Sequence, residues 1–331
     1  MEINMLTQEE KAHTRPLYEE VFPEDSRGFV DYYYTEKTKD NTIYTAERDG
    51  RIAGMLHLNP YILSVEGTEK KVNYIVAVAT KEEYRGQGIM TALLHRSLRD
   101  MYADGQSFTF LMPAAESIYL PHGFRTVYEQ EKRYYEKESA YPYPMAPACG
   151  EDCADLAAAA ERYLRANYQV YAKRDEAYYR RLLREYASDG GSLMVGRTDG
   201  EISDCRIFWP DGAEKEKQKI MVRIVDVRRM LMSVRVRSLI GVCFQITDPV
   251  IPENNRYVVL IGTEFSGVML MEGRPENSEG TITVAALSSF LFGAESVEEL
   301  SEEEGVRMSE RMKGELKKIV PLKRIYLNET V

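Results

Sequence analysis

Hydrophobic and polar positions near the start of the chain alternate between a helical and an extended period. Residues 7–22 have the helical period, and Thr7 and Glu10 have the spacing of a capping box. Stretches with the alternating or continuously apolar pattern of strands follow at residues 42–46, 51–58, 61–65 and 71–80. The first two of these flank Asp49-Gly50, a dipeptide that favours a tight hairpin turn.

A helix and further strands complete this N-terminal pattern. The period becomes helical after Gly88, and one apolar face then contains Ile89, Leu93, Leu94, Leu98 and Met101. Residues 108–112 and 125–135 have strand patterns, and a short helix is predicted between them at residues 117–122. This order of helices, antiparallel strands and strand–helix units predicts a mixed α/β fold.

Two breaks in the pattern divide the chain into three predicted domains. The prolines in residues 142–147 exclude both a helix and a central strand there. The charged run 211–219 is typical of an exposed linker, and an apolar strand is predicted after it at residues 220–225. We therefore predict domains at residues 1–138, 139–217 and 218–331. The middle domain has helical patterns at residues 152–165 and 175–187 and a hairpin around Asp199-Gly200, and the last domain mixes strands with helices.

Composition and charge exclude several classes of protein. The 331 residues include 43 Lys and Arg against 53 Asp and Glu, which gives a formal net charge of -10. A nucleic-acid partner is not expected, because affinity for phosphate backbones comes from clustered basic residues. No stretch reaches the roughly 18 uninterrupted apolar residues of a membrane span, and the N-terminus has no signal-peptide pattern. We expect a soluble, cytoplasmic protein.

Cysteine usage points to free thiols. The four cysteines, Cys149, Cys153, Cys205 and Cys243, are too few and too scattered for a disulfide framework. The first two are close in sequence, but no histidine or further cysteine lies near them at metal-binding spacing. We therefore expect no metal site.

The stretch with the clearest chemistry is residues 76–90, where a buried strand leads through a glycine-containing loop into an amphipathic helix. Such a loop directs backbone N–H groups and the positive end of the helix dipole at one point, which suits a pyrophosphate. Gly86 and Gly88 allow close approach of a ligand, and Arg85 can add charge-assisted hydrogen bonds. The glycine spacing is neither that of a P-loop nor that of a dinucleotide fingerprint. A plain strand-to-helix turn stays an open alternative.

This stretch resembles the acyl-CoA motif of the GNAT acetyltransferase superfamily, Arg/Gln-x-x-Gly-x-Gly/Ala after an apolar strand. Arg85, Gly88 and the strand through Thr80 match, whereas Met90 stands where Gly or Ala is usual. That position contributes a backbone N–H, so we expect pyrophosphate binding to be intact. The resemblance implies acetyl-CoA as co-substrate. It places the cofactor at Val78, Ala79, Thr80, Arg85, Gly86, Gln87, Gly88, Ile89 and Met90.

A second match to this superfamily is Tyr119, which lies shortly before Gly123-Phe124. In GNAT proteins a tyrosine at this place commonly protonates the departing CoA thiolate. A phenol with a pKa of about 10 suits this role, because it stays protonated near neutral pH. Two alternatives stay open: Tyr119 only packs its helix, or His122 acts as a base, although a histidine beside a helix-ending glycine is more often a cap.

The order of segments along the whole chain resembles the family of enhanced intracellular survival (Eis) proteins. Residues 222–227 and 280–293 carry this resemblance in the last segment. It implies a GNAT domain, a short degenerate GNAT-like middle unit, a C-terminal domain similar to sterol carrier proteins, and a homo-oligomer. It also implies that the C-terminal carboxylate of Val331 deprotonates the amine in the active site. A frayed tail is the alternative.

We therefore predict an acetyl-CoA-dependent N-acetyltransferase that acts on a primary amine of a small molecule or peptide by direct attack in a ternary complex. Asp25, Tyr33 and Glu116 are the candidate acceptor-binding residues, because acidic and aromatic groups at the edge of a pocket could attract a cationic amine. Two other functions stay open. One is a non-catalytic acyl-CoA sensor or scaffold, and the other is a lipid carrier with a cavity in the C-terminal domain.

Overall fold

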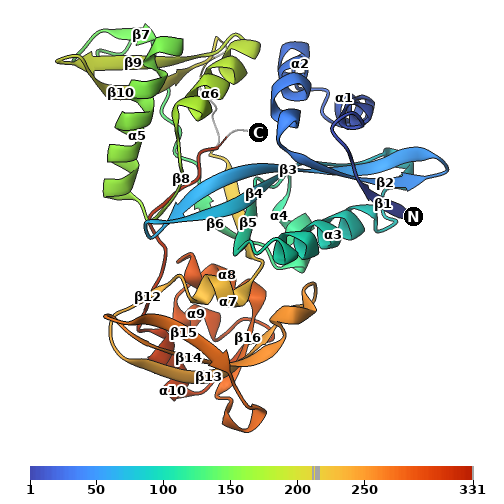
Figure 1. Ribbon diagram of the computed structural model, residues 1–331, viewed down its shortest axis with the longest axis vertical. Helices are drawn as coiled ribbons and strands as arrows, with labels where there is room; N and C mark the ends of the chain where they lie inside the picture. Colours follow the sequence, from blue (N-terminus) through green and yellow to red (C-terminus); the bar gives the residue numbers. More distant parts are fainter. Residues whose placement is uncertain (211, 213–216, 330–331) are drawn as a thin grey trace.

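A twisted mixed sheet runs through the middle of the molecule, with a small α/β unit above it on one side and a third α/β unit below (Figure 1). The computed structural model describes residues 1–210, 212 and 217–329. The prediction of a mixed α/β fold is confirmed.

Within the described residues, the central sheet contains nine strands that come from all three parts of the chain. Most of them lie in the order β1 (Glu2–Met5), β2 (Thr42–Arg48), β3 (Arg51–Val65), β4 (Thr68–Thr80), β5 (Phe108–Leu111), β11 (Lys219–Ile224) and β6 (Arg125–Glu129). β8 (Val170–Ala172) pairs with the far half of β3, and β19 (Ile325–Tyr326) pairs with β8. The predicted hairpin joins β2 to β3, and Asp49 and Gly50 both have the positive φ that its turn requires.

Residues 51–58 and 61–65, predicted as separate strands, form the single strand β3 in spite of Pro60. β2 pairs with this edge of β3 as far as Leu58, and β8 pairs with it from Leu63 onward. Pro60 lies between the two, where a missing N–H interrupts neither ladder. The edge of β3 around Pro60 is therefore open to side chains from other parts of the chain.

Helices of the N-terminal part cover both faces of the sheet. They are α1 (Arg15–Val21), α2 (Arg27–Glu36), α3 (Ile89–Ala103) and α4 (Glu116–Tyr119). α1 and α2 pack against Met55 of β3, whereas α3 packs against Leu56, the next residue, which points to the opposite face. α2 is absent from the sequence-based prediction. Its N-cap is Ser26, whose hydroxyl accepts a hydrogen bond from the Phe29 N–H.

The first helix begins later than the sequence predicts. The Glu10 carboxylate accepts hydrogen bonds from the N–H and the hydroxyl of Thr7, at 2.8 and 2.9 Å, but these bonds close a turn. A short 3-10 helix, Lys11–Thr14, follows the turn, and α1 begins with Pro16 in its first turn. The capping-box spacing therefore identified a real pair of hydrogen bonds but not the start of the α-helix.

The middle part is a small α/β unit beside the central sheet (Figure 1). Helices α5 (Cys153–Asn167) and α6 (Glu176–Ser188) pack on a sheet with the order β10 (Glu201–Phe208), β9 (Ser192–Thr198) and β7 (Met145–Pro147). The predicted helices and the hairpin at Asp199-Gly200 are present. β7 lies at the edge of this sheet, where Pro147 is tolerated.

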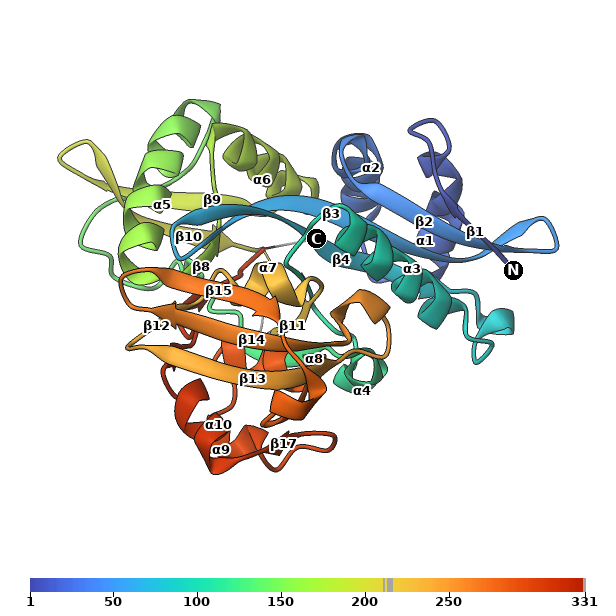
Figure 2. The same ribbon diagram turned by 60° about the horizontal axis from the view of Figure 1, so that its bottom comes forward.

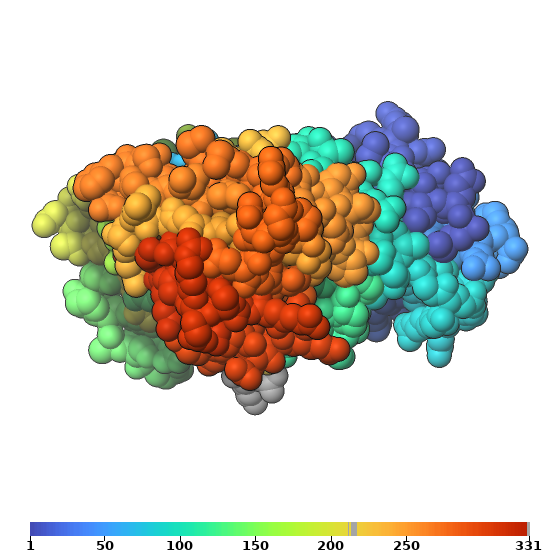
Figure 3. Space-filling model, turned by 90° about the horizontal axis from the view of Figure 1, so that it is seen from below, coloured from blue at the N-terminus to red at the C-terminus, as the bar shows by residue number. Residues whose placement is uncertain are grey.

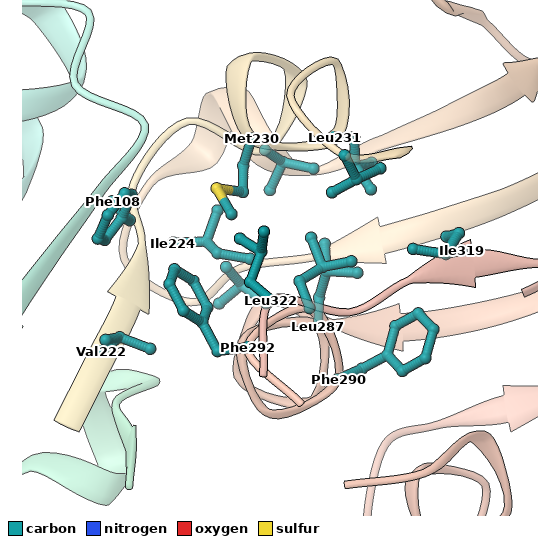
Figure 4. Packing of buried hydrophobic residues seen from close by; sticks show 14 of the residues in the cluster. Phe108, Val222, Ile224, Met230, Leu231, Leu287, Phe290, Phe292, Ile319 and Leu322 are labelled. Carbon is teal, nitrogen blue, oxygen red and sulfur yellow. The ribbon is translucent and has the colours of Figure 1, made fainter. Parts of the chain in front are cut away.

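The C-terminal part is a third α/β unit that forms the lower face of the molecule (Figures 2 and 3). Its sheet has the order β15 (Gly267–Glu272), β14 (Arg256–Thr263), β13 (Ile240–Thr247), β16 (Gly280–Thr283) and β17 (Arg307–Met308). The remaining elements are α7 (Val227–Leu231), α8 (Val284–Leu291), α9 (Val297–Leu300), α10 (Glu310–Leu316), β12 (Arg235–Val236) and β18 (Ile319–Val320). Buried side chains from α7, α8 and the chain before β19 fill the interior of this unit (Figure 4): Met230, Leu231, Leu287, Phe290 and Leu322.

The strand predicted at residues 220–225 forms β11, which lies in the central sheet and not with the rest of the C-terminal part. It pairs antiparallel with β5 on one side and with β6 on the other. The first and third parts of the chain therefore share one sheet, and the domain boundaries at 138 and 217 stay a prediction. Most of the charged run 211–219 lies outside the described residues.

Arg223 of β11 is fully buried and forms an ion pair with Asp248, which is also buried. Arg223 Nη2 lies 2.6 Å from Asp248 Oδ1, and Arg223 Nε donates a hydrogen bond to the His122 carbonyl at 2.7 Å. Asp248 also accepts hydrogen bonds from the Val250 N–H and from the Asn254 side chain. Burial lowers the pKa of Arg223, and the Asp248 carboxylate opposes this shift.

Asp248→Ala should lower the free energy of unfolding by about 3–5 kcal/mol, because it leaves the Arg223 guanidinium buried without its counter-charge. Denaturant unfolding followed by circular dichroism measures this change. The matched control is Glu201→Ala, which breaks the exposed Arg162–Glu201 ion pair and should cost no more than about 1 kcal/mol. Equal losses in the two variants would contradict a structural role of the buried pair.

Candidate active site

β4 and β5 separate near the middle of the central sheet. They pair in parallel at Tyr74–Phe110 and Ile75–Leu111, after which β5 ends and β4 continues to Thr80. On the other side of β4, the pairing with β3 shifts between Val76 and Ala79, so that two β4 residues lie opposite one β3 residue. Ala77 has a φ of 48° there, a left-handed conformation that is unusual for a residue with a Cβ atom. This bulge bends β4 at the point where it leaves β5.

The predicted cofactor residues Val78, Ala79 and Thr80 form the end of β4 beyond this bulge. Because β5 has already ended, the backbone of this segment has a free edge on that side within the described sheet. A free strand edge can hold an extended ligand through its N–H and C=O groups. These three positions are therefore suitable for the pantetheine arm of a cofactor.

The loop between β4 and α3 contains the other predicted cofactor residues. Gly86 and Gly88 have φ of 73° and 78°, and a Cβ atom added to either would meet no atom within 4 Å. α3 starts at Ile89 without a side-chain N-cap, which leaves the N–H groups of its first turn free for a ligand. Ile89 is buried, and Met90 packs its half-buried side chain against the same apolar cluster. The side chain of Met90 therefore lies against the protein.

The two polar side chains of this loop make bonds to its own backbone. Arg85 Nε donates to the Thr80 carbonyl at 3.3 Å, and Gln87 Nε2 donates to the Glu83 carbonyl at 3.2 Å. Both side chains are exposed. Each therefore stiffens the loop and has donors left for an anionic ligand.

Tyr119, the predicted proton donor, lies at the end of α4 and is 7% exposed. It belongs to the same apolar cluster as Ile75 and Leu111, the last paired residues of β4 and β5. Its ring meets Phe124 edge to face, with centroids 5.9 Å apart. Within the described residues its hydroxyl makes no hydrogen bond. Burial raises the pKa of Tyr119 to about 12, so the hydroxyl is an uncommitted proton donor at neutral pH.

The turn that carries Tyr119 is fixed by buried groups. Arg223 holds the carbonyl of His122, as described above, and His122 Nδ1 lies 3.0 Å from Nε2 of His95. Burial lowers the pKa of both histidines, which keeps this pair uncharged near neutral pH. The His122 side chain is therefore hydrogen-bonded to His95 of α3.

The three predicted acceptor residues lie in two places. Tyr33 is fully buried, and its hydroxyl is 2.9 Å from His57 Nδ1. Asp25 accepts a hydrogen bond from Tyr18, whose ring packs 5.3 Å from that of Tyr33, and burial raises the pKa of Asp25. Glu116 of α4 instead forms an ion pair with Lys219 of β11 at 2.7 Å. The structure therefore brings Asp25 and Tyr33 together and places Glu116 on another element. An acceptor-binding role for the three residues stays a prediction.

A cavity of about 630 Å³ lies between β3 and α6, at the open edge of β3 around Pro60. Its lining includes Asn59, Tyr61, Arg174, Tyr178, Arg181 and Glu185. The ring of Tyr61 lies 6.3 Å from Tyr74 and 6.1 Å from Phe110, the residues that join β4 to β5. The cavity therefore adjoins the place where β4 and β5 separate. Sequence reasoning missed the cavity, because its walls come from distant segments. Pro60, between two predicted strands, was the available signal.

The C-terminal segment reaches this cavity. Glu329 is 2% exposed, and its carboxylate contacts Arg174 at 2.7 Å and accepts a hydrogen bond from Tyr178 at 2.6 Å. Gln130 donates hydrogen bonds to the carbonyls of Leu327 and Glu329. The described chain therefore ends at side chains that line the cavity. Val331, the predicted base, lies outside the described residues.

Comparison with families of known proteins bears on the N-terminal part. Residues 2–127 match the family model described as acetyltransferase (GNAT) domain. The matched residues include β4, the glycine loop, α3 and Tyr119. The predictions of a GNAT acetyltransferase domain and of an acyltransferase are confirmed, and acetyl-CoA is the acyl donor of such a domain.

Solved structures are similar in fold over the whole chain. A GCN5-related N-acetyltransferase from Anabaena variabilis has a TM-score of 0.79 at 14% identity, and 100% of both chains is covered. A probable N-acyltransferase from Enterococcus faecalis has a TM-score of 0.78 at 15% identity, over 98% of this chain and 99% of that one. Eis1 from Mycobacterium abscessus has a TM-score of 0.72 at 14% identity, again over 100% of both chains. All three parts of the chain are therefore arranged as in these structures.

No curated protein sequence matches the chain. In the part of the chain that the structure describes, no group of three or more histidine, cysteine or acidic side chains could hold a metal ion, and the cysteines are free. None of the described helices has the length and hydropathy that a transmembrane helix needs.

Gly88→Ala should weaken binding of acetyl-CoA roughly tenfold, because a left-handed residue with a Cβ costs roughly 1–2 kcal/mol and the loop would leave its binding conformation. Titration calorimetry with acetyl-CoA measures the affinity. Gly314→Ala is the matched control: Gly314 also has open space around its Cβ position but lies in the helix α10. Unchanged affinity in Gly88→Ala would contradict a binding role of the loop.

Proposed function

We propose that the protein is an N-acetyltransferase that moves the acetyl group of acetyl-CoA to a primary amine of a small molecule or peptide by direct attack in a ternary complex. The observation that carries this proposal is the uncommitted hydroxyl of Tyr119 in the same apolar cluster as the last paired residues of β4 and β5. There, a thioester held along the free edge of β4 would have a proton donor beside its sulfur.

The nine predicted cofactor residues would each contribute through backbone or side chain. The end of β4, Val78 to Thr80, would align the pantetheine and polarise the thioester carbonyl. The free N–H groups from Gly86 to Met90 would bind the pyrophosphate, with Arg85 and Gln87 beside it. The contact of Met90 with the apolar cluster supports the view that its side chain leaves the N–H groups accessible.

In the transfer step, the amine nitrogen attacks the carbonyl carbon, the C–N bond forms and the C–S bond breaks. The attacking amine loses one proton to a base, and Tyr119 gives one proton to the leaving sulfur. Solvent returns the proton from the base to the phenolate, so the step is balanced.

Tyr119→Phe should lower kcat about 100-fold or more and leave the affinity for acetyl-CoA unchanged, because only the proton donor is lost. Stopped-flow or thiol-release kinetics measure kcat. Since the pKa of Tyr119 is raised to about 12, the wild-type enzyme should show no loss of kcat on the alkaline side below about pH 10. Tyr163→Phe, at an exposed position of α5, is the control. A wild-type kcat in Tyr119→Phe would contradict the assignment.

We further propose the C-terminal carboxylate of Val331 as the base. The fixed position of Glu329 beside the cavity supports this assignment, because two more residues can extend the chain by at most about 7 Å. The buried contacts of Glu329 with Arg174 and Tyr178 hold the preceding chain in place.

Extension of the C-terminus by Gly-Ser should abolish turnover while acetyl-CoA still binds, because it moves the carboxylate away from the amine. The same dipeptide added at the N-terminus is the control. Thiol release and calorimetry on the two proteins separate turnover from binding. Full turnover of the C-terminally extended protein would show that another group removes the proton.

A binding-only role as an acyl-CoA sensor finds no support in the site, because the proton donor is present and uncommitted. A lipid-carrier role has less support, because Leu270, Leu287 and Phe290 are buried in the apolar cluster of the C-terminal part. Figure 4 shows Leu287 and Phe290 within this cluster. Likeness of this part to sterol carrier proteins stays a prediction.

A homo-oligomer and a cytoplasmic location are further parts of the proposal. The outer face of β14 and β15 presents Ile261, Met269 and Met271 to solvent, and Phe265 in the turn between them is 91% exposed. Such an apolar surface supports contact with another copy of the chain.

Four free cysteines support the cytoplasmic location, because thiols stay reduced in a reducing compartment.

A further inference from the structure

The segment that carries Tyr119 is too short to hold its own shape. α4 has four residues, and a short 3-10 helix, Leu120–His122, follows it directly. Neither helix has a side-chain cap, and isolated helices of this length are unstable in water. Contacts from outside the segment must therefore fix the backbone that follows Tyr119.

Two arginines hold backbone carbonyls at the end of this segment. Arg223 binds the carbonyl of His122. Arg125, the first residue of β6, donates from Nη1 to the carbonyl of Phe124 at 3.0 Å, and the same atom lies 3.5 Å from the carbonyl of Leu120. The three carbonyls belong to alternate residues, so the two arginines together fix the turn between α4 and β6.

The C-terminal part of the chain binds the other side of the Arg125 guanidinium. Arg125 Nη2 lies 3.2 Å from Oε2 of Glu303, which follows α9. The two side chains are only 24% and 18% exposed, so salt and water screen this pair less than an ordinary surface pair. The guanidinium of Arg125 therefore links the C-terminal part to the turn after Tyr119.

Glu295, which precedes α9, fixes the other oxygen of Glu303. Glu303 Oε1 and Glu295 Oε2 are both buried, and neither accepts a hydrogen bond from a donor in the described residues. Burial and the nearby Glu303 carboxylate raise the pKa of Glu295 to about 7. Below that pH Glu295 keeps its proton and can donate it to Glu303. Glu303 is then held between Glu295 on one side and Arg125 on the other.

We propose that Arg125 is a positioning residue for Tyr119 and that Glu303 holds Arg125 in place. Within the described residues the Tyr119 hydroxyl makes no hydrogen bond, so the backbone turn and the packing of the ring against Phe124 orient it. A proton donor must lie within hydrogen-bond distance of the atom that it protonates. The inference rests on the N-acetyltransferase function proposed above and names the residues that keep its proton donor in place.

A double-mutant cycle on kcat tests this assignment. Arg125→Met keeps an unbranched apolar side chain but removes the donors. It should lower kcat about 10- to 100-fold, because a small displacement of a catalytic group has an effect of that size, and leave the affinity for acetyl-CoA unchanged. In the Tyr119→Phe background the same substitution should cause no further loss of kcat. Losses that multiply would show that Arg125 does not act through Tyr119 and would overturn the proposal, as would a wild-type kcat in Arg125→Met.

The role of Glu303 has its own cycle. Glu303→Gln removes the charge that holds Arg125 and keeps the shape of the side chain, so it should lower kcat by less than Arg125→Met does. In the Arg125→Met background it should lower kcat no further. An undiminished loss in that background would show that Glu303 acts by another route.

Arg256→Met is the matched control. Arg256 also donates to a backbone carbonyl, that of Glu253 at 2.8 Å, and pairs with a carboxylate, that of Glu272 at 3.4 Å, but it lies on β14. This variant should keep the wild-type kcat. An equal loss of kcat in Arg125→Met and Arg256→Met would point to general destabilisation and would overturn the proposal.

Hydrogen exchange measured by NMR separates this inference from the proposed function. The N–H groups of Gly123 and Phe124 form the hydrogen bonds that close the turn after α4. Arg125→Met should speed exchange of these two amides roughly tenfold, and Arg256→Met should not. If the wild-type protein binds acetyl-CoA but transfers acetyl to no amine, the N-acetyltransferase function fails. The exchange rates then still decide whether Arg125 holds the turn: faster exchange supports it, and unchanged exchange overturns it.

Discussion

Arg223 places a full positive charge in a completely buried position, and much of the structure is arranged around that constraint. Its guanidinium reaches Asp248 after β13 and the carbonyl of His122 after α4. Because an unpaired buried charge costs several kcal/mol, these segments must come together for the fold to form. The turn that carries Tyr119 is therefore fixed by the C-terminal part of the chain, which contributes both β11 and Asp248. The predicted chemistry of the N-terminal part depends on a residue more than one hundred positions away in sequence.

Patterns within short stretches of the sequence predicted those features whose residues are contiguous in the chain. The end of β4, the loop with Gly86 and Gly88, and α3 are contiguous in sequence, so the periods of their side chains and the glycines were sufficient to place them. The same holds for the hairpins at Asp49-Gly50 and Asp199-Gly200. The burial of Tyr33 was not predictable, because α2 itself was not predicted from its mixed polar and aromatic pattern.

Features that depend on pairing between distant segments could not be predicted. The strand pattern of β11 was clear, but its period does not say which sheet it joins. Likewise Asn59 and Arg174 have ordinary polar sequence surroundings, and they share a cavity because β2 and β8 leave a gap at Pro60. A proline between two predicted strands can thus lie inside one continuous strand whose edge is open there. An open edge is a place where a third segment can form a pocket.

β11 also sets an order of events during synthesis. β5 and β6 are complete at residue 129, but the strand that lies between them ends at residue 224. The ribosome adds roughly 5–20 residues per second, so the intervening chain takes on the order of 5–20 s to make. Throughout that interval the edges of β5 and β6 that later pair with β11 have no partner. Unpaired edges are the surfaces through which chains aggregate. The nascent protein is therefore most vulnerable before its last third emerges, although in the finished molecule β11 pairs with both strands.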